Sequence, residues 1–477
     1  MAREKVRKTK IVCTLGPATT DEPTLRRLVA AGMDVARINL SHGKHEEHHA
    51  RIATLRAAAE KEERIIGILG DLGGPKIRLG VIAAGIVELK RGQRFVLTSR
   101  DVPGDAESAS VNYPGLPSEV REGETVLLAD GALELRVIGT SRTDVECEVV
   151  IGGAISSRKG VNLPSTRLKI SAVTEKDKVD IAFAVKEELD YLAVSFVRKA
   201  QDLKDARAVL EQYATSIPLV AKIEKPEALA QLVNIVDVSD AIMVARGDLG
   251  VEIPLERVPV VQKEIIRKTR MLGKPVITAT QMLKSMVESS KPTRAETTDV
   301  ANAIIDGTDA IMLSEETAVG RYPIEAVRTM NAIALEAEGA MVQDWFPRAV
   351  EPAGRLDLQG AIARAALDAS KHPEASVIVT PSARGTTPMI ISRLRPDKPI
   401  LMLTGSRKVA QRFALIWGVI PVCTKMPADL KEVFDLAGQE AQKRGLLAPG
   451  QLAVVTAGYP IFGTPTNLIY ILKLERS

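Results

Sequence analysis

Short runs of valine, isoleucine, leucine and alanine recur along the first two thirds of the chain, and helix-forming stretches with polar and apolar positions separate them. The runs are KIVCTL from residue 10, DVARINL from 34, RIIGILGDL from 64, YLAVSF from 191, LVAKIE from 219, AIMVARGD from 241, PVITAT from 275 and AIMLSEE from 310. Continuous apolar strands that alternate with helices are typical of a parallel sheet buried on both faces. About eight such units favour a closed (β/α)8 barrel over an open doubly wound sheet.

The third and fourth runs are separated by a region of different character. It contains IVELKRGQRFVLT, TVLLADGALELRVIG and VECEVVIGGAIS, in which β-formers alternate or cluster between turn residues. This pattern predicts a small β-barrel domain, residues 72–170, inserted in a loop of the large barrel. Insertions of this kind can close over a site as lids.

The repeating pattern breaks again where WFPRAVEPAGRLDL introduces two prolines and mixed polarity. Alternation resumes with SVIVTPSARGTTP, KPILMLTG and QLAVVTAG, which predicts a separate α/β domain. The expected division is therefore a barrel of residues 1–71 and 171–345, the insertion at 72–170, and a C-terminal domain at 346–477.

Composition is ordinary for a globular protein, and 477 residues agree with two or three domains. The net charge of +4 gives no global field toward nucleic acid or membrane, so neither partner is expected. Cys13, Cys147 and Cys423 lie too far apart for a CxxC pair, which argues against a disulfide framework or a thiolate zinc site. The basic N-terminus has too short an apolar run for a signal peptide or membrane span. We therefore expect a cytoplasmic protein.

Polar and charged residues follow the predicted barrel strands. Because side chains just beyond the C-terminal ends of such strands converge on one mouth, they form one candidate site. Any one of them alone would most simply be a loop residue paired with a neighbour. The set is Arg37, Asn39, Ser41, Asp71, Ser195, Lys222, Glu224, Arg246, Gly247, Asp248, Thr280, Gln281, Ser314, Glu315 and Glu316.

The composition of this set indicates phosphate chemistry with a hard metal ion. Glu224 and Asp248 offer oxygen ligands that suit Mg2+ or Mn2+. Arg37, Arg78 and Lys222 supply cations for an anionic group and for the charge of a phosphoryl group in transfer. Lys222 and Glu224 could instead form a mutual ion pair, although side chains two apart on a strand point the same way and allow both roles.

The segment RGDLG at 246–250 places glycines on both sides of an aspartate. These glycines would let backbone N–H groups approach an anion such as a carboxylate near a helix N-terminus. An ordinary tight turn would have the same sequence.

His45, Glu46 and His49 match HExxH, the zinc-peptidase pattern. Leu55 occupies the position at which an extended zinc motif needs a third histidine. The simpler interpretation is a solvated helix start on the outside of the barrel.

Over essentially its whole length the sequence resembles the pyruvate kinase family. The resemblance rests on VCTLGPAT, DVARINLSHG, DLGGPKIR, RKGVNLP, AVSFVRKA, AKIEKPEAL, MVARGDLGVEIP, VITATQML, PTRAETTDVANAI and IMLSEETAVGRYP, in the order of the family. It implies a (β/α)8 domain, an inserted lid, a C-terminal regulatory domain and a homotetramer. It also implies a glycolytic phosphotransferase that moves a phosphoryl group from phosphoenolpyruvate to ADP, giving ATP and pyruvate, with Mg2+ or Mn2+ as cofactor.

The resemblance assigns roles to residues that match the family's motifs. It implies Glu224 and Asp248 as magnesium ligands, and Lys222, Arg37, Thr280, Ser314 and Arg78 as catalytic residues. Substrate binding falls to Arg37, Lys222, Gly247, Asp248, Thr280 and Ser195, and nucleotide binding to Arg37, His42 and Lys159. Thr280 and Ser314 would belong to the water network that protonates enolpyruvate, because a threonine hydroxyl is too weak an acid to serve alone.

Two segments depart from the family. Glu315 in LSEETA replaces the usual glycine or alanine and adds a carboxylate. The segment RLKISAVTEKD lacks the usual Leu-Pro pair, which bears on the hinge of the inserted domain at 168–171.

The loop TPSARGTTP lies between a predicted strand and a predicted helix of the C-terminal domain. Its hydroxyls and backbone N–H groups would suit an anion, and an unliganded capped helix start is the alternative. In the family this position holds the phosphate of an effector, so an allosteric site for a phosphorylated effector, a sugar phosphate or a nucleotide, is expected. Its residues are Ser382, Ala383, Arg384, Gly385, Thr386 and Thr387.

Lys76 in DLGGPKIRLG replaces a glutamate of those family members that need potassium. In such members the ion lies near the positions of Asn39, Ser41, Asp71 and the backbone of Leu72. A lysine ammonium is a compact charge that can take the electrostatic place of a monovalent cation. We therefore expect activity without K+, and the alternative is a Lys76 that points to solvent from a loop.

A protein that keeps the fold but serves as a scaffold is a second class of function. The charged groups expected for phosphoryl transfer are all present, which argues against it.

Overall fold

The computed structural model describes residues 6–342, 357–460 and 464–475, so the boundary predicted at 345/346 lies outside the described residues. Eight parallel strands close into a barrel in the order β1-β16-β15-β14-β13-β12-β3-β2. The strands are β1 (Lys10–Thr14), β2 (Val35–Asn39), β3 (Gly67–Asp71), β12 (Tyr191–Val194), β13 (Leu219–Ile223), β14 (Ala241–Ala245), β15 (Val276–Ala279) and β16 (Ala310–Leu313). The predicted (β/α)8 barrel is confirmed.

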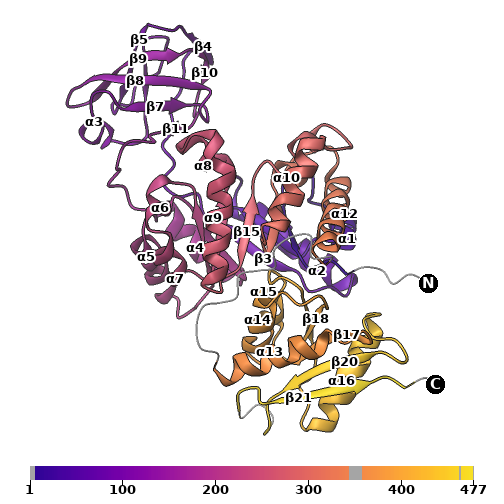
Figure 1. Cartoon of the computed structure of the whole chain (residues 1–477). Helices are drawn as coiled ribbons and strands as arrows, with labels where there is room; N and C mark the ends of the chain where they lie inside the picture. The colour runs from indigo at the N-terminus through magenta and orange to yellow at the C-terminus, as the bar shows by residue number, and fades with distance from the viewer. Residues whose placement is uncertain (1–5, 343–356, 461–463, 476–477) are drawn as a thin grey trace.

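Helices surround this barrel, which occupies the middle of the molecule (Figure 1). They are α1 (Glu22–Ala31), α2 (His45–Lys61), α4 (Glu175–Lys186), α5 (Ala200–Glu211), α6 (Pro226–Ala230), α7 (Leu232–Val238), α8 (Arg246–Glu252), α9 (Val258–Met271), α10 (Arg294–Ile305), α11 (Glu315–Ala318) and α12 (Pro323–Val342), with the 3-10 turns η1 (Leu255–Arg257) and η2 (Lys284–Val287). Among the described residues no helix has the length and apolar character needed to span a bilayer.

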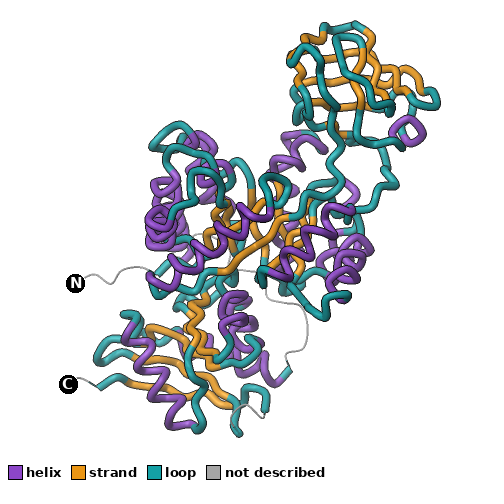
Figure 2. Tube along the Cα trace, turned by 180° about the vertical axis from the view of Figure 1, so that it is seen from behind, coloured by secondary structure: helices purple, strands orange, loops and turns teal. Residues whose placement is uncertain are grey.

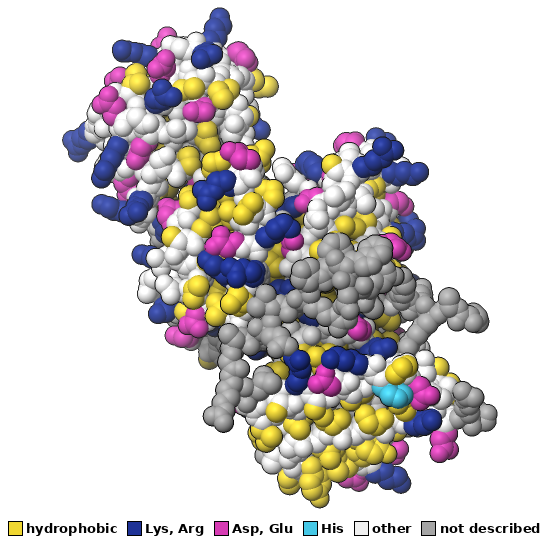
Figure 3. Space-filling view, viewed as in Figure 1, with side chains coloured by type: hydrophobic (Ala, Val, Ile, Leu, Met, Phe, Trp, Pro, Cys, Tyr) yellow, Lys and Arg dark blue, Asp and Glu magenta, His cyan; other side chains and the backbone are white. Residues whose placement is uncertain are grey.

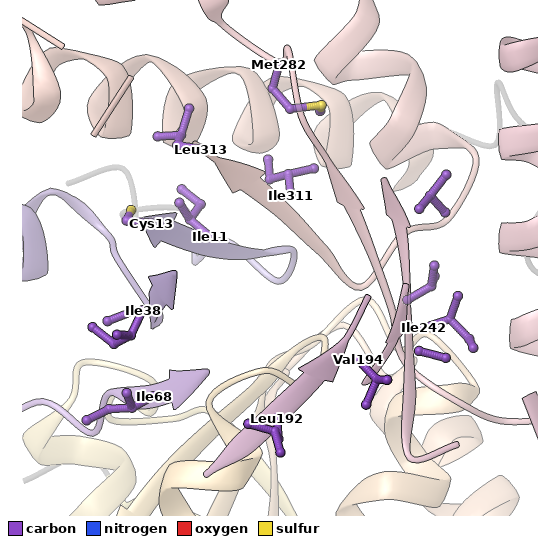
Figure 4. Packing of buried hydrophobic residues seen from close by; sticks show 14 of the residues in the cluster. Ile11, Cys13, Ile38, Ile68, Leu192, Val194, Ile242, Met282, Ile311 and Leu313 are labelled. Atoms are coloured by element: carbon purple, nitrogen blue, oxygen red, sulfur yellow. The ribbon is translucent and has the colours of Figure 1, made fainter. Parts of the chain in front are cut away.

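Alternation along each strand divides the barrel core into two layers. In β1, Val12 belongs to the cluster inside the barrel, whereas Ile11 and Cys13 belong to the larger cluster between strands and helices. Figure 4 shows this outer layer, in which Ile11 and Cys13 stand near Ile311 and Leu313 of the neighbouring strand. Because both faces are buried, the strands read as continuous apolar runs.

The inserted domain stands at one end of the molecule, on the side of the barrel opposite the C-terminal domain (Figures 1 and 2). A six-stranded sheet and a two-stranded sheet pack around a separate core that includes Phe95 and Leu135. The elements are β4 (Ile86–Leu89), β5 (Arg94–Thr98), β6 (Ser108–Ser110), α3 (Leu116–Glu119), β7 (Thr125–Leu128), β8 (Leu133–Thr140), β9 (Asp144–Ile151), β10 (Gly153–Ser156) and β11 (Val161–Asn162).

The return connection from the inserted domain to the barrel is held by one arginine. Arg198 donates hydrogen bonds to the carbonyl oxygens of Leu168 (2.8 Å) and Ile170 (2.7 Å). This side chain therefore fixes the backbone of the segment in which the usual Leu-Pro pair is missing.

The C-terminal domain is a five-stranded sheet in the order β19-β18-β17-β20-β21 with helices on it. Its elements are α13 (Leu358–Ser370), β17 (Ala375–Pro381), α14 (Thr386–Arg393), β18 (Ile400–Thr404), α15 (Arg407–Phe413), β19 (Val419–Cys423), α16 (Leu430–Lys443), β20 (Leu452–Ala457) and β21 (Leu468–Lys473). The sequence predicted β17, β18 and β20 but missed the edge strands β19 and β21, of which β21 runs antiparallel to β20.

Candidate active site

Lys222, near the end of β13, is the centre of a buried charged cluster at the barrel mouth. Its ammonium nitrogen lies 2.7 Å from the hydroxyl of Ser195, 2.8 Å from Glu224 Oε1 and 3.3 Å from Asp71 Oδ1. Burial opposes the charge, but the carboxylates of Asp71 and Glu224 outweigh it and raise the pKa of Lys222 above its usual value. The side chain is therefore a fixed cation.

Arg37, on β2, shares the Asp71 carboxylate with Lys222. Its Nε and Nη2 atoms both lie 2.7 Å from Asp71 Oδ2, and Nη1 donates to the Thr14 hydroxyl at 3.0 Å. Burial alone would raise the pKa of Asp71, but Lys222 and Arg37 hold it below its ordinary value. Asp71 thus positions two cations at the mouth and stays ionised between them.

Glu224 and Asp248 fit a hard divalent cation. Burial raises the pKa of Glu224, and the negative charge of Asp248 raises it further, so the two carboxylates repel each other. Glu224 Oε2 accepts the Phe196 N–H at 2.8 Å, whereas the buried Oε1 has no hydrogen-bond partner beyond its ion pair with Lys222. Two carboxylates with free coordination capacity suit Mg2+, which completes its shell with water and substrate oxygens.

A larger protein-made metal cage is absent from the part of the chain that the structure describes. No group of three or more histidine, cysteine, aspartate or glutamate side chains there could hold a metal ion. The HExxH histidines lie near carboxylates of α4 and of the residue that follows it. His45 lies 2.8 Å from Asp180 Oδ1 and His49 lies 3.0 Å from Glu187 Oε1, and the His49 side chain remains 64% exposed, as expected for a helix start on the outside of the barrel.

Thr280 follows β15 in a strained backbone conformation. Its φ of +69° is uncommon for a β-branched residue, and strain of this kind concentrates at functional sites. The Thr280 hydroxyl accepts the N–H of Gly247 at 2.7 Å, which joins the end of β15 to the first turn of α8.

Arg246 holds this arrangement, a role that the sequence did not indicate. Its Nη2 donates to the Thr280 carbonyl at 2.8 Å, and its Nη1 lies 2.7 Å from both carboxylate oxygens of Asp299. Asp299 is 53 residues away in sequence, so no local pattern links the two.

Ser314 follows β16 with its hydroxyl buried and without a hydrogen-bond partner. Its backbone N–H donates to Glu316 Oε2 at 2.7 Å, and Glu316 Oε1 accepts the Leu283 N–H at 3.0 Å. Glu316 is thus a structural brace, and the Ser314 hydroxyl is left available for another partner. The Glu315 carboxylate takes no part in this contact and forms an ion pair with Lys284.

Lys76 lies between the inserted domain and the barrel, where it faces an aspartate from each of them. Its ammonium nitrogen is 3.8 Å from Asp130 Oδ1 and 3.8 Å from Asp248 Oδ1. Asp71 is instead paired with Arg37 and Lys222. The partner Asp130 was missed, because it lies in a turn of the inserted domain with no pattern that distinguishes it.

The other residues of the predicted cation region make their own local contacts. The Asn39 side-chain oxygen accepts the Ser41 N–H at 3.2 Å, and the Leu72 carbonyl accepts the Ser195 hydroxyl at 2.8 Å. Arg78, which the sequence predicted as a phosphate contact and not as part of this region, donates to the Arg158 carbonyl at 3.1 Å.

His42 and Lys159, the expected nucleotide contacts, lie in different surroundings. Burial lowers the pKa of His42, and the cations Arg78, Lys76 and Arg37 lower it further. His42 is thus a neutral ring among positive charges, which suits a polyphosphate nearby. Lys159 is exposed, and its carbonyl accepts the Leu79 N–H at 2.9 Å.

The predicted effector loop lines a cavity of the C-terminal domain. Ser382, Ala383, Arg384, Thr386 and Thr387 form one wall, and the segment Thr464, Pro465, Thr466 forms another. Gly385, which caps α14, has a φ of +86°, and a side chain there would strike Phe413. The loop therefore places the N-terminus of α14 at this cavity.

A closed parallel barrel whose mouth holds a buried lysine, an arginine and the carboxylates of Glu224 and Asp248 defines a barrel enzyme built for an anionic substrate and a hard metal ion. Family models match almost the whole chain: the pyruvate kinase barrel domain matches residues 6–327 and the pyruvate kinase alpha/beta domain matches residues 360–472. The chain therefore belongs to the pyruvate kinase family and is a phosphotransferase of class EC 2.7.1.40.

Individual relatives agree with this assignment. A pyruvate kinase of Geobacillus stearothermophilus is 44% identical over 469 residues, which cover 98% of this chain and 80% of that protein. A pyruvate kinase of Staphylococcus aureus is 44% identical over 467 residues, covering 97% and 79%. A crystal structure of a pyruvate kinase from Cryptosporidium parvum superposes with a TM-score of 0.90 at 36% identity and covers 98% of this chain and 96% of that one.

Proposed function

We propose that this enzyme transfers the phosphoryl group of phosphoenolpyruvate to ADP, giving ATP and an enolpyruvate that is then protonated to pyruvate. The observation that carries the proposal is the fixed cation of Lys222, held by Asp71, Glu224 and Ser195 at the open mouth of the barrel. A preorganised cation stabilises the negative charge of a phosphoryl group in transfer without reorganising during the reaction.

Two arginines complete the phosphate contacts in this proposal. Arg37 is already oriented by Asp71 and Thr14, so it can bind phosphate at no further ordering cost. Arg78 lies on the connection to the inserted domain and reaches the phosphate when that domain closes over the barrel.

Glu224 and Asp248 would hold Mg2+, or Mn2+, together with oxygens of the substrate. The bound ion would neutralise phosphoryl and carboxylate oxygens. The N–H groups of Gly247 and Asp248, with Thr280 and Ser195, would orient the substrate carboxylate. The N–H of Gly247 donates to the Thr280 hydroxyl, so it would exchange this acceptor for the substrate carboxylate on binding.

Protonation of enolpyruvate needs an ordered proton path. The hydroxyls of Thr280 and Ser314 follow adjacent strands, and that of Ser314 has no partner of its own. We assign them to a water chain that delivers the proton. His42, Lys159 and Arg37 would contact the nucleotide.

The decisive experiment is formation of pyruvate from phosphoenolpyruvate, with and without ADP and with and without Mg2+. Formation that requires both supports the proposal. No turnover with an intact fold would instead favour the scaffold function, and stoichiometric bound zinc would favour the HExxH alternative.

We further propose that Lys76 supplies the charge that other members take from K+. Support comes from its ammonium nitrogen, which lies 3.8 Å from Asp248 Oδ1, the proposed metal-binding carboxylate. Lys76 is also among the cations that lower the pKa of His42. Its two partners, Asp130 and Asp248, are other carboxylates than Asp71, beside which the sequence predicted the lysine. The proposal therefore concerns the electrostatic role and not the ion's own coordination site.

The cavity at residues 382–387 would bind the phosphate of an allosteric effector. A phosphorylated effector should shift the phosphoenolpyruvate saturation curve of the native enzyme, and Thr386→Ala should abolish the shift. No shift with any sugar phosphate or nucleotide, or an unchanged shift in the variant, would refute this assignment.

We also propose the division into a barrel at 1–71 and 171–345, a lid at 72–170 and a regulatory domain at 346–477, in a cytoplasmic homotetramer. Sedimentation of the native enzyme tests the oligomeric state.

A further inference from the structure

A cavity lies where the lower end of the barrel meets the C-terminal domain, far from the mouth that holds Lys222. From the barrel it is lined by the loop between α9 and β15 and by Asp309, and from the C-terminal domain by the end of α14. Figure 3 shows dark blue side chains of lysine and arginine gathered along this junction. The charged residues in its lining are Arg270, Lys274, Asp309, Arg393 and Arg395.

The cations of this cavity outnumber its acids. Asp309 is the one carboxylate of the lining, and both of its oxygens are engaged: Oδ1 accepts Arg395 Nη2 at 2.9 Å, and Oδ2 accepts the Val276 N–H at 2.8 Å. Lys274 turns its ammonium to the Ser239 carbonyl at 2.7 Å. The guanidinium groups of Arg270, Arg393 and Arg395 therefore face a single carboxylate, and both of its oxygens already accept hydrogen bonds.

Arg395 carries unused hydrogen-bond donors. Its Nε and Nη1 atoms are buried and have no hydrogen-bond partner, although its Nη2 is satisfied by Gly307 and Asp309. Its guanidinium stacks over Trp417, with 4.5 Å from Cζ to the ring centroid. Its backbone has a φ of +51°, which costs free energy for a residue with a side chain. Buried donors without partners are rare, and a bound water or anion is the usual acceptor for them.

Two glycines bring the other guanidinium groups close. A side chain at Gly307 would collide with Arg270, and one at Gly273 would collide with Arg393. Both glycines also have positive φ values, +98° and +69°. Burial and the charge of Arg395 together lower the pKa of Arg270 to about 10, and Asp309 offsets only part of this effect.

We propose that this junction cavity is a binding site for a small phosphate-bearing anion, distinct from the active site and from the 382–387 loop. A phosphate offers several acceptor oxygens and two negative charges, which match the free donors of Arg395 and the charges of Arg270 and Arg393. The ligand would bridge the barrel and the C-terminal domain, because α9 and α14 each supply an arginine.

Part of the remaining lining is apolar, beside Gly273 and Ser392, and predicts a preference among phosphates. Pro275, Met389 and Ile416 line the same cavity. An ester with an apolar or aromatic group should therefore bind more tightly than inorganic phosphate, since it also removes apolar surface from water.

Trp417 provides a local reporter for the test. The chain has two tryptophans, so Trp345→Phe leaves Trp417 as the only one. The full-length Trp345→Phe enzyme is titrated with inorganic phosphate, methyl phosphate and phenyl phosphate, and thermal unfolding is followed in parallel. We expect a saturable change in fluorescence, tightest binding for phenyl phosphate, and a higher unfolding temperature with ligand.

Variants decide where the ligand binds. Arg270→Gln and Arg393→Gln should weaken binding roughly tenfold or more, and Arg270→Lys should keep part of it. Arg267→Gln is the matched control, because Arg267 is an exposed arginine of the same helix. Thr386→Ala should leave the titration unchanged. The proposal fails if no ester gives a saturable signal, if the signal survives both arginine variants, or if Thr386→Ala abolishes it.

Discussion

The barrel mouth and the connection to the inserted domain each contribute a lysine to the candidate site, but the surroundings of the two side chains differ. Lys222 is buried and has three partners within 3.3 Å. Lys76 has a side chain that is 30% exposed, and it lies 3.8 Å from each of two aspartates. The closed barrel strands thus hold Lys222 rigidly, whereas Lys76 lies on a connection where its charge has more freedom to adjust.

This difference in burial and pairing determines how much free energy a substitution at each lysine should cost. A buried ion cluster has a large desolvation cost, so losing one member leaves the others uncompensated. An exposed pair is screened by water and contributes little. Substitutions at the mouth should therefore act strongly on turnover and on folding, and substitutions at the connection should act mainly on ion requirements.

The largest effect is expected for Lys222→Met. Loss of the fixed cation should lower kcat by about 1,000-fold, because it removes charge stabilisation of the phosphoryl group. It also leaves Asp71 and Glu224 without their shared cation, so the free energy of unfolding should fall by about 3 kcal/mol. Steady-state kinetics and thermal unfolding measure the two effects. Lys222→Arg keeps the charge and should recover much of the stability. A loss of less than tenfold in kcat would overturn the assignment.

Glu224→Gln should come next. The neutral side chain is a poorer ligand, so half-maximal activity should need roughly tenfold more Mg2+. Because the substitution removes a charge at the site, direct metal binding in the absence of substrate should weaken as well. Glu256→Gln, on the exposed turn η1, is the matched control and should leave the Mg2+ requirement unchanged. An unaltered Mg2+ requirement in Glu224→Gln would exclude this residue as a ligand.

Much of the barrel and its mouth follows from the sequence, because the information is local. Each strand is a short apolar run, and the residue types at its C-terminal end predict the candidate site. The edge strands β19 and β21 of the C-terminal domain were harder to predict from the sequence. Pro421 interrupts β19, and Tyr470 and Ile471 leave β21 partly exposed, so neither strand reads as a buried parallel strand.

The supporting contacts could not be predicted, since they join segments that are distant in sequence. Arg246 depends on Asp299, and Lys76 depends on Asp130 across the space between two domains. Neither partner stands in a motif of its own. Local patterns thus predicted which side chains gather at the candidate site, and the tertiary structure shows which other side chains hold them.

Lys76→Glu tests the proposed electrostatic role of the partly exposed lysine. The native enzyme should work in buffers free of K+ and Na+, and the variant should lose roughly tenfold in activity there and regain it when K+ is added. The effect is smaller than at Lys222 because solvent screens this lysine. Lys90→Glu, an exposed lysine of the inserted domain, should show no K+ dependence. Strong activation of the native enzyme by K+ would contradict the proposed role.

Glu315→Gln should have the smallest effect, although Glu315 follows the same barrel strand as Ser314. Its carboxylate pairs with Lys284, and both side chains are more than half exposed. Such a pair contributes about 0–1 kcal/mol to stability. The free energy of unfolding should therefore change by less than about 1 kcal/mol, and kcat should change by less than about twofold. A large loss of kcat in this variant would mean that position at the mouth, rather than burial and pairing, decides which charges take part. The contrast between Lys222 and Lys76 would then need another explanation.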